Sequence, residues 1–418
     1  MNAFLRFLLL GCALAGALAG TSLAPAATTP GAGLPTTPIV AAPNRAWDFP
    51  ADGVTFDSEF EAARLSECTR VAPLDYALLS SPENRPINPS PWFAFRVRST
   101  KPQVLTIRVS CEGTRLRYVP KISVDGHNWI ALPPEAYTPG PKPDEGTLRL
   151  DVGPEPLWVA AQEIVSVAAL EAWSLALERL PFVTRSEIGR SVGNRPIHQL
   201  LIDATGPAPK SGSNQQPGLV VVLSRQHPPE VTGSQALMTF IETILADTPR
   251  AREFRAKFAL LVVPLINPDG VALGHWRHNL NGVDTNRDWG VFEQPETRAV
   301  RDAIMKAREG RRQFLHLDFH SNFIDDLYTQ PDDVATNPPN FTQPWVEGIE
   351  RRVPTYKLKR SASRNPTPTT SHNWAHAAFG VPAITYEVGD NTERTVLRAV
   401  AAAAAESMME QLLLAAPK

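Results

Sequence analysis

The sequence predicts an α/β fold in which a mixed sheet with helices on both faces follows a smaller antiparallel β-sandwich. Between residues 46 and 153, apolar and polar residues alternate in short runs separated by turns, which is typical of an antiparallel sandwich. From residue 154 to residue 418, short apolar runs alternate with segments of helical periodicity. That alternation indicates an α/β/α arrangement, with the sheet between two helical layers.

The amino terminus has the pattern of a secretory signal peptide. Residues 1–26 comprise a basic start, an apolar run and the small residues Ala24-Pro25-Ala26 before Ala27. Since no later run of about 20 apolar residues follows, we expect a secreted or periplasmic protein with no stable membrane span. Leu9-Leu10-Gly11-Cys12 also resembles a lipoprotein signal, so lipidation is an alternative. Residues 27–45, rich in Pro, Ala and Thr, are expected to form a disordered leader.

The amino-acid composition limits the kinds of molecule that the protein is expected to bind. The chain of 418 residues has 43% hydrophobic and 20% charged residues, as ordinary globular proteins do. Its formal net charge of -2 gives no reason to expect nucleic acid or an anionic membrane as a partner. The 40 prolines are about twice the usual share of roughly 5%, which indicates long, stiffened connections.

The sandwich region shows its alternation most clearly in two runs. Every second residue is apolar in each of them (Phe93, Phe95, Val97; Leu105, Ile107, Val109). A further run from Lys121 to Leu132 is interrupted by the turn Asp125-Gly126. No cluster of residues suited to chemistry occurs here, so we expect a scaffold or a substrate-positioning role.

Cys68 and Cys111 both lie in the sandwich region and remain after removal of the signal. Cys111 shares the parity of the buried positions in its strand, so its side chain should point into the core. An oxidising compartment favours a disulfide between the two cysteines, and a pair of buried free thiols is the alternative.

The first polar motif of the α/β region lies between a strand and a helix. Gly218–Ser224 is a short apolar run rich in β-branched residues, which predicts a buried parallel strand. Val231–Ala246 carries apolar residues at helical spacing. His227 and Glu230 therefore follow a strand and precede a helix, which is where open α/β sheets place their active sites.

The same patterns predict the remaining elements. We expect helices over Leu157–Leu180, Glu296–Glu309 and Glu393–Leu414. We expect strands over Phe258–Leu265, Phe314–Phe319 and Ala383–Tyr386, and two earlier strands joined across residues 189–196.

His320 and Glu387 each follow a predicted strand directly. Because the carboxyl ends of parallel strands meet at one edge of a sheet, we expect these two residues beside His227 and Glu230. Two imidazoles and a carboxylate suit Zn²⁺ and leave a fourth coordination position open. The sequence therefore predicts one zinc ion per chain, held by His227, Glu230 and His320, with another divalent metal as the alternative.

The order of the polar motifs resembles a known family. The motifs are His227-x-x-Glu230, Asn267-Pro-Asp-Gly270, Arg277, Gly282-Val-Asp-x-Asn-Arg287, His320-Ser321 and Glu387. This set resembles the zinc carboxypeptidase family, of the carboxypeptidase A type, over about Trp158 to Leu414. The resemblance implies a carboxypeptidase-type catalytic domain over residues 154–418.

The amino-terminal region carries a second resemblance. Trp92-Phe-Ala-Phe-Arg96 and the turn before Trp129 are similar to the domain that precedes the catalytic domain in cytosolic carboxypeptidases, the tubulin-deglutamylase branch. A secreted member of that branch would not act on tubulin.

The resemblance implies a role for each remaining motif residue. Glu387 would act as the general base and then as the acid, and Arg277 would face the developing oxyanion. Asn286 and Arg287 would clamp the free carboxyl end of the substrate, which makes the enzyme an exopeptidase. Asp284 is similar to the family's carboxylate that orients the first histidine ligand.

Two positions concern closure over the substrate and selectivity. Many family members carry a Tyr on a mobile loop where this chain has Asn365, and Tyr356 is a candidate replacement. His372 stands where the family varies its selectivity, and with Arg364 nearby it suggests an acidic substrate side chain.

The sequence leaves three functions open. The first is an exported zinc carboxypeptidase acting on peptides with a free carboxyl terminus, with cell-wall stem peptides among the candidates. The second is an aspartoacylase-like zinc hydrolase of small acylated amino acids. The third is a catalytically silent homologue that binds peptide ends, although the intact ligands and Glu387 argue against it.

Overall fold

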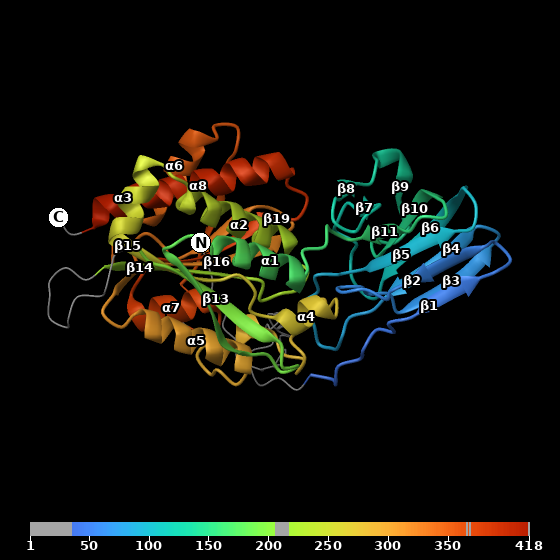
Figure 1. Cartoon of the computed structure of the whole chain (residues 1–418), viewed down its shortest axis with the longest axis horizontal. Coiled ribbons are helices and arrows are strands. Elements are labelled where there is room, and N and C mark those ends of the chain that lie inside the picture. Colours follow the sequence, from blue (N-terminus) through green and yellow to red (C-terminus); the bar gives the residue numbers. More distant parts are fainter. Residues whose placement is uncertain (1–35, 205–216, 365–366, 368, 417–418) are drawn as a thin grey trace, which may run out of the picture.

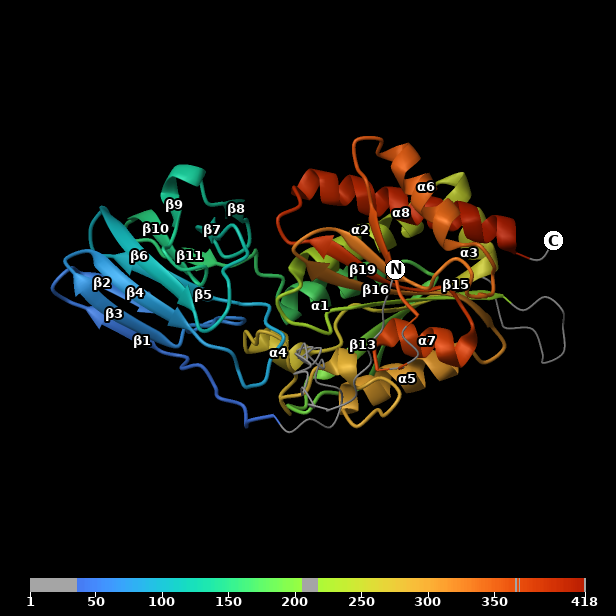
Figure 2. The same cartoon turned by 180° about the vertical axis from the view of Figure 1, so that it is seen from behind.

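The protein folds into two bodies that lie side by side, a β-sandwich and an α/β domain (Figure 1). The computed structural model describes residues 36–204, 217–364, 367 and 369–416. The expected signal segment, the first part of the expected leader and Asn365 lie outside the described residues. The opposite view shows the same two bodies at the two ends of the long axis (Figure 2).

The sandwich consists of two facing sheets. In the described residues, the first sheet has the order β1-β2-β5-β11-β7-β8. Its strands are β1 (Ala46–Phe49), β2 (Val54–Asp57), β5 (Ala94–Ser99), β7 (Lys121–Ser123), β8 (Ile130–Ala131) and β11 (Leu157–Ala160). The second sheet has the order β3-β4-β6-β10-β9. Its strands are β3 (Glu67–Ala72), β4 (Asp75–Ser80), β6 (Gln103–Cys111), β9 (Tyr137–Pro139) and β10 (Glu145–Val152).

One pair in the sandwich departs from the predicted antiparallel arrangement. β4 pairs with β6 in parallel, whereas the other pairs of both sheets are antiparallel. The chain between β4 and β6 passes through β5 in the opposite sheet, so no hairpin joins them. A crossover of this length permits the parallel direction.

The core of the sandwich follows the predicted alternation. Phe95, Val97, Leu105, Ile107 and Val109 are all buried in one cluster between the two sheets. The cluster also contains Val231 and Trp276 from the α/β part of the chain. The two bodies are therefore joined by apolar packing as well as by the chain.

Cys68 and Cys111 are both buried and both are free thiols. Cys111 points into the core, as its parity predicts. Burial raises the pKa of the Cys68 thiol to about 12, so the thiolate is disfavoured. The structure thus has the second of the two arrangements that the sequence left open.

Part of the predicted leader is ordered by backbone pairing. Thr37 N donates to Arg85 O at 2.7 Å, and Val40 N donates to Glu83 O at 2.6 Å. The described part of the leader, residues 36–45, is thus hydrogen-bonded to this loop of the sandwich, although it forms no regular strand. Composition alone did not predict this, because the partners lie 48 and 43 positions further along the chain.

The helix predicted over Leu157–Leu180 is wrong in its first part. Leu157–Ala160 forms strand β11, which pairs with β5 and β7. The helix is limited to α1 (Val167–Leu177), and the Ser166 side chain caps it by accepting from Ala169 N at 3.1 Å. Two neighbouring strands offer β11 a full ladder of hydrogen bonds, which outweighs its helical periodicity. The sandwich consequently extends past the expected boundary at residue 153.

The α/β domain is built on a mixed sheet with the order β12-β13-β15-β14-β16-β19-β17-β18 in the described residues. Its strands are β12 (Val183–Arg190), β13 (Pro196–Ile202), β14 (Gly218–Ser224), β15 (Phe258–Val263), β16 (Arg312–Asn322), β17 (Asp326–Thr329), β18 (Lys359–Ala362) and β19 (Ala383–Gly389). The central strands β15, β14, β16 and β19 run parallel to one another. The mixed sheet that the sequence predicts is confirmed.

Helices cover both faces of this sheet (Figure 1). The helices are α2 (Val231–Leu245), α3 (Pro249–Lys257), α4 (Pro268–Ala272), α5 (Pro295–Ala307), α6 (Thr342–Arg352), α7 (Ser371–Phe379) and α8 (Arg394–Ala415). One core cluster joins α2, α3, α6 and α8 to the sheet, and another joins α5 and α7 to its other face. No helix in the described ranges has the length and apolar character of a membrane span.

The packing of α2 on β16 brings the two sides of the predicted metal site together. Gly233 lies in the first turn of α2, and a Cβ atom there would come within 2.6 Å of the His320 carbonyl oxygen. Gly233 N also donates to Ser321 Oγ at 2.9 Å. The close approach needs a residue without a side chain, because interiors are already close-packed.

Candidate active site

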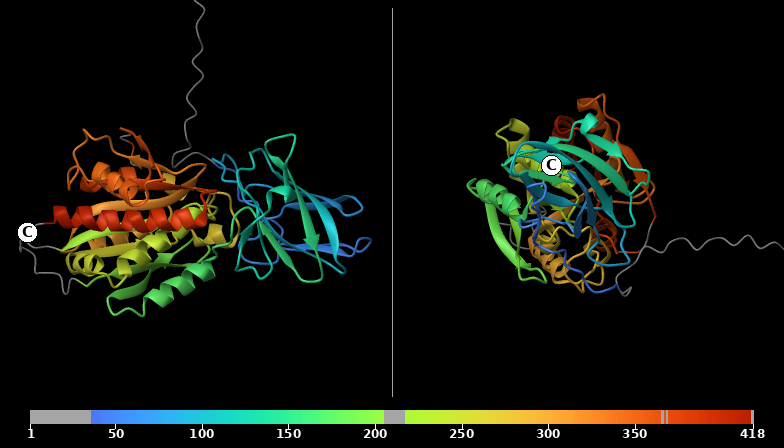
Figure 3. Two further views of the ribbon diagram at one scale, coloured as in Figure 1. Left: turned by 90° about the horizontal axis from the view of Figure 1, so that it is seen from above. Right: turned by 90° about the vertical axis from the view of Figure 1, so that its right-hand side faces the viewer.

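Parallel pairing places the predicted site residues at one edge of the α/β sheet. His320 and Glu387 are partners in the register between β16 and β19. His227 follows β14, the strand on the other side of β16, and Glu230 directly precedes α2. The top view shows that this edge faces the sandwich (Figure 3).

His227, Glu230 and His320 converge on one point. Glu230 Oε1 lies 2.7 Å from His227 Nδ1, and Glu230 Oε2 lies 2.7 Å from His320 Nδ1. The two Nδ1 atoms are 3.2 Å apart, and the three ligand atoms lie within 4.8 Å of one another. Two imidazole nitrogens and a carboxylate directed at a common point fit zinc.

The outer nitrogen of each histidine contacts a carboxylate, which is partly buried in Asp284 and fully buried in Asp318. His227 Nε2 lies 2.9 Å from Asp284 Oδ1, and His320 Nε2 lies 2.9 Å from Asp318 Oδ2. Such contacts fix which nitrogen carries the proton and leave Nδ1 free to bind a metal. The sequence analysis included Asp284 and missed Asp318. A residue two positions before His320 shares its strand face, which was the signal that could have found Asp318.

The ligand loop is held by a buried cation. Arg225 Nε donates to Pro228 O at 2.9 Å, and its Nη1 donates to Ser234 Oγ at 3.2 Å. Arg225 has a positive φ of 58°, a conformation that is uncommon outside glycine. These contacts turn the chain from the end of β14 toward the metal site.

Glu387 faces the same cavity with one oxygen unpaired. Its Oε2 atom has no hydrogen-bond partner within the described residues. Burial raises the pKa of Glu387 to about 8, against the opposing effect of His320. A carboxyl whose pKa lies near neutrality is suited to take up and release a proton.

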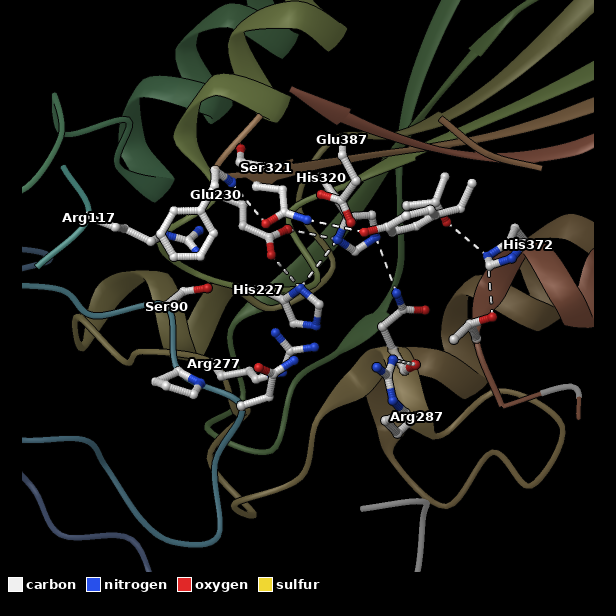
Figure 4. A pocket seen from close by; sticks show the side chains of 18 residues that line it. Ser90, Arg117, His227, Glu230, Arg277, Arg287, His320, Ser321, His372 and Glu387 are labelled. Carbon is white, nitrogen blue, oxygen red and sulfur yellow. Dashed lines mark hydrogen bonds and ion pairs between the residues drawn. The ribbon is translucent and has the colours of Figure 1, made fainter. Parts of the chain in front are cut away.

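Arg277 and Asp284 form a largely buried pair beside the first ligand. Arg277 Nε lies 2.6 Å from Asp284 Oδ2, so Asp284 bridges Arg277 and His227. Figure 4 shows Arg277 next to His227 in the cavity. Although burial opposes it, the charges of Arg277 and His227 hold the pKa of Asp284 well below its usual range.

Asn286 and Arg287 line the same cavity as the three ligands. Asn286 Oδ1 accepts from Ser371 N at 2.9 Å, and its Nδ2 lies 3.4 Å from His320 Nε2. Arg287 Nη1 donates to the Asn286 carbonyl oxygen at 2.8 Å. These contacts set the direction of the Arg287 guanidinium, which also lines the cavity.

His372 lies at this end of the cavity, but the charge pattern suggested for it is not present. His372 Nδ1 is 2.9 Å from Thr385 Oγ1, and burial lowers the pKa of His372 to about 4, so the ring is neutral at pH 7. Arg364 pairs with Asp333 and is largely exposed. Tyr356 packs against the core of the α/β domain, and the tyrosine that lines the cavity is Tyr328.

All the predicted site residues except Asp284 line a single cavity of about 250 Å³. They are His227, Glu230, Arg277, Asn286, Arg287, His320, His372 and Glu387. The sandwich adds lining residues that the sequence analysis missed, namely Asn88, Pro89, Ser90 and Arg117. Figure 4 shows Arg117 at one end of the site and His372 at the other, with the three ligands between them.

The geometry defines a candidate zinc centre at the edge of an α/β sheet, with the carboxyl group of Glu387 and three arginines around it. The chain belongs to the zinc carboxypeptidase family, whose sequence profile matches residues 170–407, more than half of the chain.

Curated relatives cover part of the chain. Cytosolic carboxypeptidase 2 of Homo sapiens is 24% identical over 312 residues, which is 64% of this chain and 32% of that protein. Cytosolic carboxypeptidase 6 of Caenorhabditis elegans is 24% identical over 290 residues, which is 64% of this chain and 62% of that protein. The chain thus spans less than two thirds of the length of either relative.

Solved structures share the fold of both bodies. A metallo-carboxypeptidase from Burkholderia cenocepacia has a TM-score of 0.71 at 19% identity, over 86% of this chain and 99% of that one. A metallo-carboxypeptidase from Pseudomonas aeruginosa has a TM-score of 0.69 at 20% identity, over 87% of this chain and all of that one. The shared region is longer than the α/β domain, so it includes the sandwich.

The contact between Asp318 and His320 yields a test of the metal site. We expect Asp318→Asn to weaken zinc binding by about 10- to 100-fold, because the amide no longer provides a charged acceptor for His320 Nε2. Competition against a chromogenic chelator measures the affinity. Asp302→Asn, on the outer face of α5, is the matched control and should bind zinc as the wild type does. Unchanged affinity in Asp318→Asn would contradict this assignment.

Proposed function

We propose that this protein is an exported zinc metallocarboxypeptidase that hydrolyses the last peptide bond of peptides with a free carboxyl terminus. The observation that carries the proposal is the single cavity that joins the three ligands, Glu387 and Arg287. A carboxylate clamp beyond the reaction centre limits the enzyme to chain ends. Family membership supports the reaction class.

His227, Glu230 and His320 would hold the metal. Zinc, when bound, supplies a Lewis acid for the scissile carbonyl group and lowers the pKa of a bound water to about 7. Asp284 and Asp318 keep the two imidazoles oriented, with Nδ1 directed at the metal position.

Glu387 is the group that moves protons in this proposal. Its unpaired Oε2 faces the cavity, where it takes a proton from the attacking water and later delivers it to the leaving amine. The shift of its pKa toward neutrality lets one carboxyl perform both steps.

Two arginines would bind oxygen atoms of the substrate on either side of the scissile bond. Arg277 holds Asp284 through Nε, which leaves its terminal nitrogens for the oxyanion that develops on the carbonyl oxygen. Arg287 presents a planar fork that matches the terminal carboxylate, and the Asn286 carbonyl oxygen orients it.

In this proposal, the part of the cavity that would receive the terminal side chain is polar, and His372 adds no positive charge to it. His372, Thr370 and Thr385 line its end, and the imidazole is neutral at pH 7. This arrangement favours hydrogen bonding to the terminal side chain over pairing with an acid. Stem peptides of the cell wall remain one source of free carboxyl ends that an exported enzyme would meet.

Export is part of the proposal and rests on the pattern of residues 1–26. The curated relatives are named cytosolic carboxypeptidases, so export would set this chain apart from them and would remove cytosolic proteins from its substrates.

A pool of synthetic peptides tests the activity. We expect mass spectrometry to show loss of single terminal residues from peptides with free carboxyl ends, but not from their amidated counterparts. A chelator should abolish the loss, and added zinc should restore it. Turnover of acylated amino acids alone would favour the aspartoacylase-like alternative, and binding without turnover would favour a silent homologue.

Glu387→Gln tests the proton transfer. We expect kcat to fall by about 10²- to 10⁴-fold, because the amide cannot take up a proton. Zinc content and KM should stay near their wild-type values, since no ligand or clamp residue changes. Glu347→Gln on the exposed face of α6 is the matched control. Unchanged turnover in Glu387→Gln would remove this residue from the mechanism.

The mature amino terminus tests export. In a secretion-competent host, we expect the full chain to be recovered outside the cytoplasm and to begin at Ala27. Intact mass and amino-terminal sequencing give the start. A chain that keeps Met1 in the cytoplasm would contradict export, and a lipid-bearing Cys12 would replace the predicted cleavage site with the lipoprotein alternative.

A further inference from the structure

A loop of the sandwich inserts a carboxylate beneath the segment that carries Arg277. Glu83 lies in the connection between β4 and β5 and is 0% exposed. Its Oε1 accepts from Arg277 N at 2.9 Å and from His278 N at 2.7 Å, and its Oε2 accepts from Trp276 N at 2.7 Å. One side chain from the first domain thus binds three successive backbone N–H groups of the second.

Glu83 is held in its charged form. Burial alone would raise the pKa of Glu83, but His275, His278 and the backbone donors keep it below its usual value. Hydrogen bonds to an ionised acceptor are shorter and stronger than those between neutral groups. A buried carboxylate without such donors would be very costly, so Glu83 and the segment from Trp276 to His278 depend on each other.

The neighbouring residue fixes the far end of the same segment. His278 Nδ1 lies 2.5 Å from Asn84 Oδ1, and Asn84 Nδ2 donates to Gly282 O at 3.1 Å. Trp276 Nε1 donates to Trp92 O of the sandwich at 2.9 Å. The backbone on both sides of Arg277 is therefore bound to the first domain.

The position of this backbone affects the active site because it determines where the Arg277 side chain lies. The Arg277 side chain enters the cavity and binds Asp284, which binds the ligand His227. An oxyanion donor works only when it is fixed before charge develops, and small displacements are expensive in rate.

We propose that Glu83 is a positioning residue, which fixes the backbone from which Arg277 acts, so that the sandwich completes the active site of the α/β domain. The proposal rests on the carboxypeptidase function proposed above. In this proposal the sandwich helps to position a catalytic side chain, and it is more than a separate binding module or a spacer.

Other contacts hold the two domains together without Glu83. Arg117 of the sandwich pairs with Asp390 at 2.9 Å, and Arg394 pairs with Glu163, which follows β11. Asn391 Nδ2 donates to the Arg117 carbonyl oxygen at 3.0 Å. Replacement of Glu83 should therefore leave the domains docked while it disturbs Arg277.

Glu83→Gln in the full-length zinc-loaded enzyme is the test. The amide keeps the volume, but its NH₂ group meets the Trp276 N–H as a second donor, and the charge is lost. We expect kcat to fall by about 10- to 100-fold, a part of what loss of an oxyanion donor costs, with KM within about threefold. Asp52→Asn is the matched control, because Asp52 accepts from Arg70, Tyr76 and Leu74 inside the sandwich. It should keep wild-type kcat.

A double-mutant cycle separates positioning from a general loss of structure. If Glu83 acts through Arg277, then Glu83→Gln should change kcat by less than about twofold in an Arg277→Ala background. A peptide phosphonate, which mimics the tetrahedral oxyanion, should bind Glu83→Gln about tenfold more weakly than the wild type. Binding of a product carboxylate should be unchanged.

Three results would overturn the inference. They are wild-type kcat in folded Glu83→Gln, full multiplication of the two kcat losses in the double variant, and equal weakening of phosphonate and product binding. If Glu83→Gln does not fold, Asn84→Ala removes only the adjacent contacts and should show the same pattern with a smaller loss. A wild-type protein that cleaves no peptide overturns the proposed function, and this inference with it, whereas an active wild type with unaffected variants overturns the inference alone.

Discussion

The parallel pairing of β14, β16 and β19 is the constraint on which the site depends. In this register, Ser224 lies opposite Phe319 and His320 lies opposite Glu387. The carboxyl ends of the three strands, with the residues that follow β14, therefore lie at one edge of the sheet. The interiors of β14 and β16 are buried on both faces, and a slip of one residue would reverse the direction of every side chain. Core packing thereby fixes the positions of His320 and Glu387 at this edge of the sheet.

Local patterns were sufficient for most of the fold. The predicted strand Gly218–Ser224 coincides with β14, and the predicted helix that follows ends one residue from α2. Both are strongly periodic and need no distant partner to be recognised. The prediction was wrong for β11 because the conformation of this strand is decided by β5 and β7. These two strands lie on either side of β11 in the sheet but far from it in the sequence.

The residues of the site likewise fall into those that local sequence patterns predict and those that only the fold reveals. His320 and Glu387 lie near the carboxyl ends of β16 and β19, and His227 and Glu230 lie in the loop after β14, so strand patterns in the sequence could place all four. Asp318 could have been predicted from the alternation of side chains along a strand, since it lies two residues before His320 and on the same strand face. Glu83 had no local signal at all, because a Glu in a polar, Pro-rich loop looks like a solvent-exposed residue. Only the fold shows that the loop is capped by another domain.

The choice of a carboxylate at that position has a physical reason. The segment from Trp276 to His278 belongs to no strand in the described residues, so its backbone N–H groups have no ladder to satisfy them. An apolar side chain from the sandwich would bury three unpaired donors, each of which costs about 1–3 kcal/mol. A carboxylate satisfies all three and also sets their direction, which apolar packing does not do. Precision at Arg277 thus follows from the requirement that buried polar groups be paired, and it ties the geometry of the catalytic edge to a domain outside the matched family region.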